Sequence, residues 1–220
     1  DAWFNQGTLL GDLGRHREAV ASYDRALQIQ PDQLQVHLNR GLTLQELGEQ
    51  EAALADFSRA VQIAPQSAEA HFCKGNALSA LDRLDAALAC YDEAIAIDPG
   101  NGPAWNNRGT AHRSRGDLEQ AIADFSRALE LDPTKVSALH NRGIARRARG
   151  DPAGAIADLS RVIELDRRQP EFTQTFWTYL DRAVSAQRIE TGRRLLAEHG
   201  ALLRDVEQRY GVQPRFLVAI

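Results

Sequence analysis

A glycine recurs at intervals of 34 residues along most of this chain, and no other feature constrains the fold as strongly. Its copies are Gly7, Gly41, Gly75, Gly109 and Gly143. Three more sets of aligned positions, which we call columns, keep the same step. One holds alanine: Ala19, Ala53, Ala87, Ala121 and Ala155. Another holds a large apolar residue, and the third a small apolar one: Tyr23, Phe57, Tyr91, Phe125 and Leu159; Ala26, Ala60, Ala94, Ala128 and Val162. Units of one constant period predict a solenoid built by stacking a single supersecondary motif.

Each unit carries the sequence signals of two helices joined by a turn. A glycine suited to a helix C-terminus follows the first helix at Gly14, Gly48, Gly116 and Gly150. A proline, which cannot donate a backbone hydrogen bond, closes the second helix at Pro31, Pro65, Pro99 and Pro133. In the last unit Arg167 replaces this proline, and the period ends. The pattern predicts an all-α solenoid of five 34-residue helix-turn-helix repeats over residues 1–166, followed by a helical extension over 167–220.

This pattern resembles the tetratricopeptide repeat family. The likeness is carried by "AWFNQGTLLGDLGRHREAVASYDRALQIQP" and its four successors, with predicted boundaries at 1–33, 34–67, 68–101, 102–135 and 136–166. The resemblance implies a right-handed superhelix in which the first helix of every repeat lines a concave groove. It also implies a non-catalytic scaffold that binds a peptide or protein partner in that groove, without a cofactor.

An asparagine column lies two residues before the repeating glycine, and by analogy with the family it faces the groove. It reads Asn5, Asn39, Cys73, Asn107 and Asn141. Each amide can donate to and accept from an extended peptide backbone, which predicts binding that tolerates many sequences. The alternative is that these amides tie neighbouring helices together. Because amides lower helix propensity, their recurrence favours the binding role.

One turn further on, the same helical face carries Thr8, Leu42, Asn76, Thr110 and Ile144. Beyond this column the late repeats present arginines where the early repeats are acidic or polar, namely Arg113 and Arg147. More arginines occur in the last two repeats: Arg108, Arg115, Arg142, Arg146 and Arg149. Such a cluster suits carboxylates, which predicts a partner that is acidic toward repeats four and five. The alternative is a solvated charged face that pairs with nearby Asp and Glu.

Two further columns bear on possible ligands. One subgroup of the family clamps the C-terminal carboxylate of chaperones with Lys, Asn and Arg, but the clamp positions here hold Phe4, Thr8, Glu69 and Cys73. Only a partial match remains at Asn76, Asn107 and Asn141, so chaperone tails are not expected partners. The aromatic column near the start of each repeat reads Trp3, His37, His71, Trp105 and Leu139. Its histidines replace a packed aromatic residue, and we expect them to be structural.

Residues 165–220 stay helical in pattern but lose the 34-residue step. Their segments "LDRRQPEF", "W-x-YLDRAVS-x-x-R-I-x-x-G" and "YGVQPRFLVAI" resemble the early part of the membrane-bound lytic murein transglycosylase B family. That family cleaves peptidoglycan between N-acetylmuramic acid and N-acetylglucosamine, and one glutamate acts first as acid and then as base. The resemblance implies an alternative function, in which the repeats are the targeting arm of such an enzyme.

In that family the catalytic glutamate follows the segment that matches "LVAI", and this sequence stops at Ile220. The glutamates that are present do not match its position: Glu171, Glu190, Glu198 and Glu207. We therefore expect no glycan turnover, and contact with peptidoglycan only through the missing catalytic part. Another role for residues 167–220 is to cap the last repeat, since a solenoid end is otherwise exposed, with the aromatic residues Phe172, Phe176 and Trp177.

Composition excludes several other classes of protein. Net charge is −4, to which residues 167–220 contribute +3 from 9 Arg against 6 Asp and Glu, and residues 1–166 contribute −7. These values argue against nucleic acid as a partner. No apolar stretch approaches the roughly 18 residues of a membrane helix, and the Cys and His residues show no metal-ligand spacing. Because the chain starts at Asp1 and lacks Met, we expect a fragment, periplasmic if the transglycosylase likeness holds and cytoplasmic otherwise.

Overall fold

The computed structural model describes residues 2–167 with Arg194 and Ala197, and in this part of the chain it contains ten helices and no strand. The helices are α1 Ala2–Asp12, α2 His16–Ile29, α3 Leu34–Glu46, α4 Gln50–Ile63, α5 Ala68–Ala80, α6 Leu84–Ile97, α7 Gly102–Arg115, α8 Leu118–Leu131, α9 Val136–Ala148 and α10 Pro152–Arg167. The predicted all-α solenoid is confirmed. Several predictions lie outside the described residues, those on Phe172, Phe176, Trp177, Glu171, Glu190, Glu198 and Glu207.

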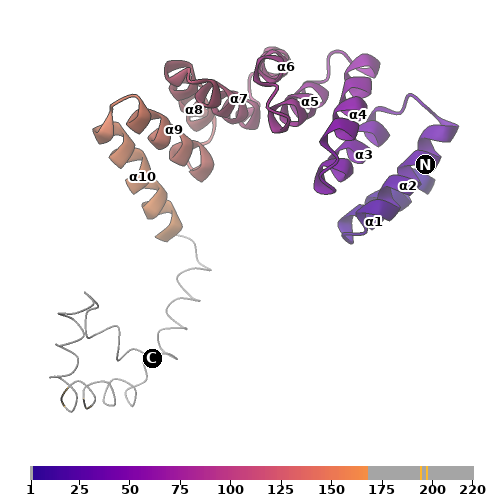
Figure 1. Cartoon of the computed structure of the whole chain (residues 1–220), viewed down its shortest axis with the longest axis horizontal. Coiled ribbons are helices and arrows are strands. Elements are labelled where there is room, and N and C mark those ends of the chain that lie inside the picture. The colour runs from indigo at the N-terminus through magenta and orange to yellow at the C-terminus, as the bar shows by residue number, and fades with distance from the viewer. Residues whose placement is uncertain (1, 168–193, 195–196, 198–220) are drawn as a thin grey trace. The chain divides into compact units, whose positions relative to one another are not determined.

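The chain divides into two compact units, Asp1–Ile163 and Glu164–Ile220. In the first unit consecutive helices pack on one another, and Figure 1 shows them following one another along an arc. Each odd-numbered helix from α1 to α7 also contacts the next odd-numbered helix, whereas the described even-numbered helices make no comparable contacts with each other. The odd-numbered helices therefore form the inner side of the curve. We call their exposed face the inner wall.

The recurring glycine lets an aromatic ring lie directly against the first helix of its own repeat. A Cβ added to Gly41 would come within 2.5 Å of Cε1 of Phe57, and one added to Gly75 within 2.7 Å of the same atom of Tyr91. Both rings are fully buried. The alanines of the neighbouring columns are buried too, so the two helices of a repeat approach closely around the ring. This contact explains why glycine and a large residue recur together at a fixed spacing.

Glycine and proline set the helix ends, as the sequence predicts. The glycines after the first helices have φ angles from 73° to 93°, and in repeat three Asp82 takes this place with a φ of 58°. The second helices of the first four repeats end two residues before each proline, at Ile29, Ile63, Ile97 and Leu131. α10 has no proline at this place and continues to Arg167, past the register where the others stop. The loss of the period therefore coincides with a longer helix.

The aromatic column anchors the first helices of repeats two, three and four to the turn before each of them. Nε2 of His37 lies 2.8 Å from the carbonyl oxygen of Pro31, and Nε2 of His71 and Nε1 of Trp105 make the equivalent bonds at 2.9 and 3.0 Å. A carbonyl only accepts, so each ring nitrogen donates. The second ring nitrogen of His37 lies 2.8 Å from Asp56. These contacts agree with the expected structural role of the histidines.

Three half-buried arginines each hold a buried aspartate of their own repeat and reach a residue of the preceding repeat. Arg108 holds both carboxylate oxygens of Asp124 with Nε and Nη2 at 2.8 and 2.6 Å, and its Nη1 reaches Asp92 of the preceding repeat at 2.6 Å. The hydrogen bond with Asp124 raises the pKa of Arg108 above its usual value. Arg40 and Arg142 hold an aspartate of their own repeats in the same two-pronged way.

Candidate functional site

A pocket of about 360 Å³ opens on the inner wall between α5 and α7. Six residues line it, and all but Ala80 carry a polar group: Asn76, Ser79, Ala80, Tyr91, Asn107 and Thr110. Three of these residues, Asn76, Asn107 and Thr110, belong to the predicted binding set. The side chains of repeats three and four therefore meet at one place, where amides and hydroxyls border an open space.

The asparagines of this region form a chain of hydrogen-bonded amides. Nδ2 of Asn107 donates to Oδ1 of Asn76 at 2.8 Å, and the same oxygen accepts the hydroxyl of Tyr91 at 2.9 Å. Asn106 donates to Oδ1 of Asn107 at 3.1 Å, and Asn141 donates to Asn106 at 3.5 Å. These bonds cross from repeat three to repeat five, so the amides link helices of successive repeats. Each of these amides has donor and acceptor positions beyond the bonds named here, and two of them, Asn76 and Asn107, line the pocket.

In the early repeats the predicted residues lie on the same wall, but their side chains do not form a series of hydrogen-bonded amides. Asn5 is exposed on α1, and the half-buried side chain of Asn39 on α3 makes no hydrogen bond with the described residues. Thr8 donates to the carbonyl of Phe4 at 3.2 Å and accepts the hydroxyl of Tyr23 at 3.4 Å. The amide column is thus continuous only in the later repeats.

Most arginines of the late repeats are paired inside the chain. Besides Arg108 and Arg142, Arg115 lies 2.8 Å from Asp85, and Arg146 lies 2.9 Å from Asp158. For these residues the structure matches the alternative of a charged face paired with nearby carboxylates. Arg113 and Arg147 differ, because neither has an ion pair among the described residues. They are the two arginines of the predicted binding set.

Arg113 carries an unsatisfied donor near the pocket end of α7. Its Nε is buried and has no hydrogen-bond partner among the described residues, whereas its place at the end of the helix favours a cation beside the helix dipole. A buried donor without an acceptor costs free energy until a partner supplies one. The side chain of Arg147 is exposed in the last turn of α9, one repeat further along.

Burial controls the ionisation of the pocket and its surroundings. Burial raises the pKa of the Tyr91 phenol far above its usual value, so the hydroxyl stays protonated and donates to Asn76. Burial also raises the pKa of the Cys73 thiol to about 11, and the nearby Glu69 adds to this shift. Cys73 interrupts the asparagine column with a neutral thiol. The pocket therefore presents neutral hydrogen-bonding groups at physiological pH.

Two lining or linking residues were not predicted from the sequence as part of the site: Tyr91 and Asn106. Tyr91 belongs to a column in which tyrosine and phenylalanine alternate, and only the tyrosines place a hydroxyl beside the inner wall, in repeats one and three. That alternation was the available signal. Asn106 precedes Asn107 directly, and neighbouring residues on a helix point in different directions, so nothing in the sequence indicated that both join one chain of amides.

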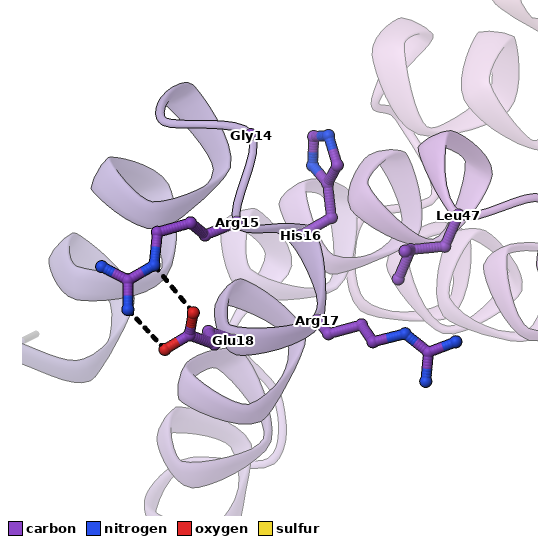
Figure 2. A pocket seen from close by; sticks show the side chains of 6 residues that line it. All are labelled: Gly14, Arg15, His16, Arg17, Glu18 and Leu47. Atoms are coloured by element: carbon purple, nitrogen blue, oxygen red, sulfur yellow. Dashed lines mark hydrogen bonds and ion pairs between the residues drawn. The ribbon is translucent and has the colours of Figure 1, made fainter.

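A second pocket, of about 240 Å³, lies at the turn between α1 and α2. Figure 2 shows its lining residues, Gly14, Arg15, His16, Arg17, Glu18 and Leu47. Arg15 and Glu18 close on each other through two hydrogen bonds of 2.7 and 2.6 Å, and both are exposed. An exposed pair of this kind contributes little and leaves few groups for a ligand. This pocket is the weaker candidate.

The described residues show no arrangement for metal binding, since no three His, Cys, Asp or Glu side chains are grouped to hold an ion. Nor does any helix in the described part have the length and apolar character needed to cross a membrane. The chemistry of the inner wall is therefore that of amides, hydroxyls and arginines.

Stacked helix pairs with a glycine-centred contact in each pair define a helical-repeat protein. Family models described as "Tetratricopeptide repeat" match residues 13–74, 68–101 and 102–135, which together cover more than half of the chain. The chain therefore belongs to the tetratricopeptide repeat family over this stretch, which supports a scaffold for protein interactions. A model described as "Transglycosylase SLT domain" matches residues 123–220. Both predicted resemblances are thus confirmed, and the second begins earlier than predicted, inside α8.

Solved structures support the fold. MamA from Desulfovibrio magneticus RS-1 is 22% identical and superposes with a TM-score of 0.72, over 77% of this chain and 96% of that chain. YrrB, described as a tetratricopeptide repeat protein with an unusual peptide-binding site, is 20% identical with a TM-score of 0.64, over 76% of this chain and 86% of its own. Among curated proteins, none matches the sequence. At these identities the structural likeness establishes the fold alone.

Proposed function

We propose that the repeat array is a non-catalytic scaffold that binds an extended peptide segment of a protein partner along its inner wall. The observation that carries this proposal is the pocket between α5 and α7, where Asn76, Asn107 and Thr110 border an open space. An extended peptide carries one donor and one acceptor per residue, and side-chain amides and hydroxyls can satisfy both. Contacts of this kind recognise backbone more than sequence.

The late end of the wall adds a preference for negative charge. Arg113 and Arg147 lack internal ion pairs in the described chain, while the buried Nε of Arg113 lacks an acceptor. A carboxylate of the partner would pair with the guanidinium groups of these two arginines through charge-assisted hydrogen bonds. The partner segment is therefore acidic where it meets repeats four and five.

The backbone-binding part is tested with a peptide array probed by the wild-type chain and by a variant with Asn107→Ala and Asn141→Ala. We expect about thirtyfold weaker binding, because two hydrogen-bonding groups of about 1 kcal/mol each are lost. Gln120→Ala, on the exposed surface of α8, is the matched control and keeps wild-type affinity. Unchanged binding by a folded double variant contradicts the proposal.

Loss of folded structure in the double variant would instead favour the tying role of the amides. Thr110→Val then tests the pocket separately, because its hydroxyl bonds only to a backbone oxygen of its own helix, that of Asn106. The charge preference is tested with a variant that combines Arg113→Gln and Arg147→Gln. Its affinity for acidic peptides should fall and depend less on salt, while its affinity for neutral peptides should stay unchanged. Equal losses for acidic and neutral peptides would count against the basic end.

A second function is supported by the match of the transglycosylase model to residues 123–220. In this proposal the repeats are the targeting arm of an enzyme that acts on peptidoglycan. The sequence predicts contact with peptidoglycan only through the missing catalytic part, but because the match extends over residues 167–220 we propose that these residues contact the glycan too. The test is co-sedimentation of the 220-residue chain with insoluble peptidoglycan. We expect retention that is unchanged in the Asn107→Ala and Asn141→Ala variant. A chain that stays in the supernatant contradicts this function and leaves the scaffold function standing.

A further inference from the structure

The pocket between α5 and α7 lies at the repeat junction with the most complete set of polar side chains. Apart from Ala80, its lining positions hold amides and hydroxyls: Asn76, Ser79, Tyr91, Asn107 and Thr110. At the same positions, each of the other three junctions has residues without an amide or a hydroxyl, among them Leu42 between repeats one and two, Leu42, Phe57 and Cys73 between two and three, and Phe125 and Ile144 between four and five. The chemistry of this pocket is therefore particular to one junction of the array.

On the α5 side the pocket presents hydrogen-bond donors. Both lone pairs of Oδ1 of Asn76 are occupied, by the hydroxyl of Tyr91 at 2.9 Å and by Nδ2 of Asn107 at 2.8 Å. These bonds fix the orientation of the amide and leave its Nδ2 without an acceptor among the described residues. Asn76 lines the pocket and is only half-buried, so this donor group is accessible from the open space.

On the α7 side the pocket presents mainly acceptors. Oδ1 of Asn107 accepts one hydrogen bond, from Asn106 at 3.1 Å, and keeps a second lone pair, while one hydrogen of its Nδ2 is also free. The hydroxyl of Thr110 donates to the backbone carbonyl of Asn106 at 3.0 Å, so its oxygen is left to accept from a ligand. A group that spans the pocket thus meets donors on α5 and acceptors on α7.

This arrangement discriminates among the side chains of a bound segment. An aliphatic side chain would leave the free donors and acceptors unpaired. A carboxylate has no hydrogen for Asn107 and Thr110, an ammonium group has no lone pair for Asn76, and none of the six lining residues is charged to pair with either. A carboxamide carries its carbonyl and its NH2 group on separate atoms, so it can meet both sides at once.

We propose that the pocket binds the carboxamide side chain of an asparagine or glutamine in the partner segment, an inference that rests on the proposed scaffold function. The guest carbonyl accepts from Nδ2 of Asn76, and the guest NH2 group donates to Oδ1 of Asn107 and to Thr110. The lining includes Tyr91 of α6, which is 1% exposed and belongs to the second helix of its repeat. A side chain can leave the line of the inner wall to reach this residue, whereas the backbone of an extended segment continues along the wall.

The test uses short synthetic peptides of alanine and serine with one guest residue at the centre. Two glutamates stand at one end or at the other, so that both directions of the segment are sampled. The guests are asparagine, glutamine, glutamate, leucine and lysine, and fluorescence anisotropy measures the affinity of each peptide for the 220-residue chain. The better of the two carboxamide guests should bind about tenfold more tightly than any other guest, which corresponds to the net gain from one or two hydrogen bonds.

Each other result overturns the proposal in a recognisable way. Equal affinities for all guests would remove the carboxamide pocket and leave the backbone-binding scaffold standing. A glutamate guest that binds more tightly than glutamine would assign the space to the arginines of the late repeats. If no peptide of the set binds, the carboxamide pocket fails together with backbone recognition.

A pair of tyrosine variants connects the preference to the pocket. Tyr91→Phe removes the hydroxyl that holds Oδ1 of Asn76, and the phenylalanines in the same column of repeats two and four show that the fold accepts the change. It should reduce the preference for carboxamide guests by about threefold or more. Tyr23→Phe makes the same change in repeat one, away from the pocket, and should keep the full preference.

A second pair of variants tests the acceptor side. Thr110→Ile copies Ile144, the aligned residue of repeat five, and should weaken carboxamide guests while sparing leucine. Thr110→Ser keeps the hydroxyl and should retain the preference. Circular dichroism checks that every variant is folded. If Tyr91→Phe and Thr110→Ile both discriminate among the guests as wild type does, the preference arises elsewhere and the proposal is wrong.

Discussion

Repeats three and four pack in the same way but are held by different chemistry. In both, a ring lies on the glycine of the first helix, Tyr91 on Gly75 and Phe125 on Gly109. Repeat four adds the ion pair of Arg108 with the buried Asp124, while the aligned positions of repeat three hold a lysine and a cysteine, Lys74 and Cys90. The shape of a repeat is therefore set by the glycine, ring and alanine contacts. The charged tie between repeats is an addition that some repeats lack.

This difference coincides with the position of the pocket. The inner-wall pocket draws residues from both repeats, and its amide bond between Asn107 and Asn76 joins the repeat with the charged tie to the repeat without it. Arg108 also reaches Asp92 of repeat three at 2.6 Å, so an ion pair and the polar contacts of the inner wall together hold these two repeats. A partner that binds there would consequently stabilise the junction as well.

The largest effect is expected from removing one partner of the buried pair in repeat four. Asp124→Ala leaves Arg108 with only the exposed Asp92 and should lower the free energy of unfolding by about 3 kcal/mol. Cys90→Ala removes the aligned residue of repeat three and should cost less than about 1 kcal/mol, since no ion pair is lost. Urea unfolding followed by circular dichroism measures both. Equal losses would refute the distinction between the repeats.

The next effect tests the contact that the two repeats share. Gly75→Ala places a Cβ 2.7 Å from the ring of Tyr91 and should destabilise the array by about 2 kcal/mol. Gly143→Ala is the matched control, because its Cβ would lie 3.3 Å from the flexible Leu159. There the gain in helix propensity, about 0.5–1 kcal/mol, offsets the tight contact. Thermal unfolding of both variants decides, and a Gly75→Ala protein as stable as wild type would contradict the packing argument.

Much of this architecture could be predicted from the sequence, because the repeat signals are local. Gly41 and Phe57 recur at one spacing, and the contact between them is what that spacing requires. For Arg108 the sequence left two alternatives open, a carboxylate of a partner or a nearby Asp or Glu, and it did not single out Asp124. An arginine on a helix surface can face solvent, a partner or a carboxylate on another helix, and only the packing of the helices decides. For the same reason the bond between Asn107 and Asn76 could not be distinguished from a groove-facing amide.

Building the missing tie into repeat three should give a smaller effect. Lys74→Arg with Cys90→Asp recreates the arrangement of repeat five, where Arg142 bonds to Asp158 and to Ser126 of the preceding helix. The aligned residue before repeat three is also a serine, Ser58. We expect a gain of about 1 kcal/mol in unfolding free energy, because desolvation offsets most of the attraction. Lys74→Arg alone should be neutral, and a double variant less stable than this control would reject the idea.

The smallest effect concerns the thiols that distinguish repeat three. Burial and the nearby Glu69 raise the pKa of Cys73 to about 11, from an ordinary value of about 8.5. Below the ordinary value both folded and unfolded chains hold the neutral thiol, so Cys73 adds no pH dependence. Between about pH 8.5 and 11 the unfolded chain loses its proton first, and stability falls as pH rises.

At pH 9 the free energy of unfolding should be about 0.8 kcal/mol lower than at neutral pH on account of Cys73, and Cys73→Ala should remove this loss. The comparison of the two proteins at each pH cancels the contribution of Tyr91, whose raised pKa gives the same sign. Urea unfolding at pH 7, 8, 9 and 10 provides the measurement. If wild type and Cys73→Ala lose stability in parallel over this range, the buried thiol does not stay protonated in the folded chain. Repeat three would then owe its neutral interior to Tyr91 and the amides alone.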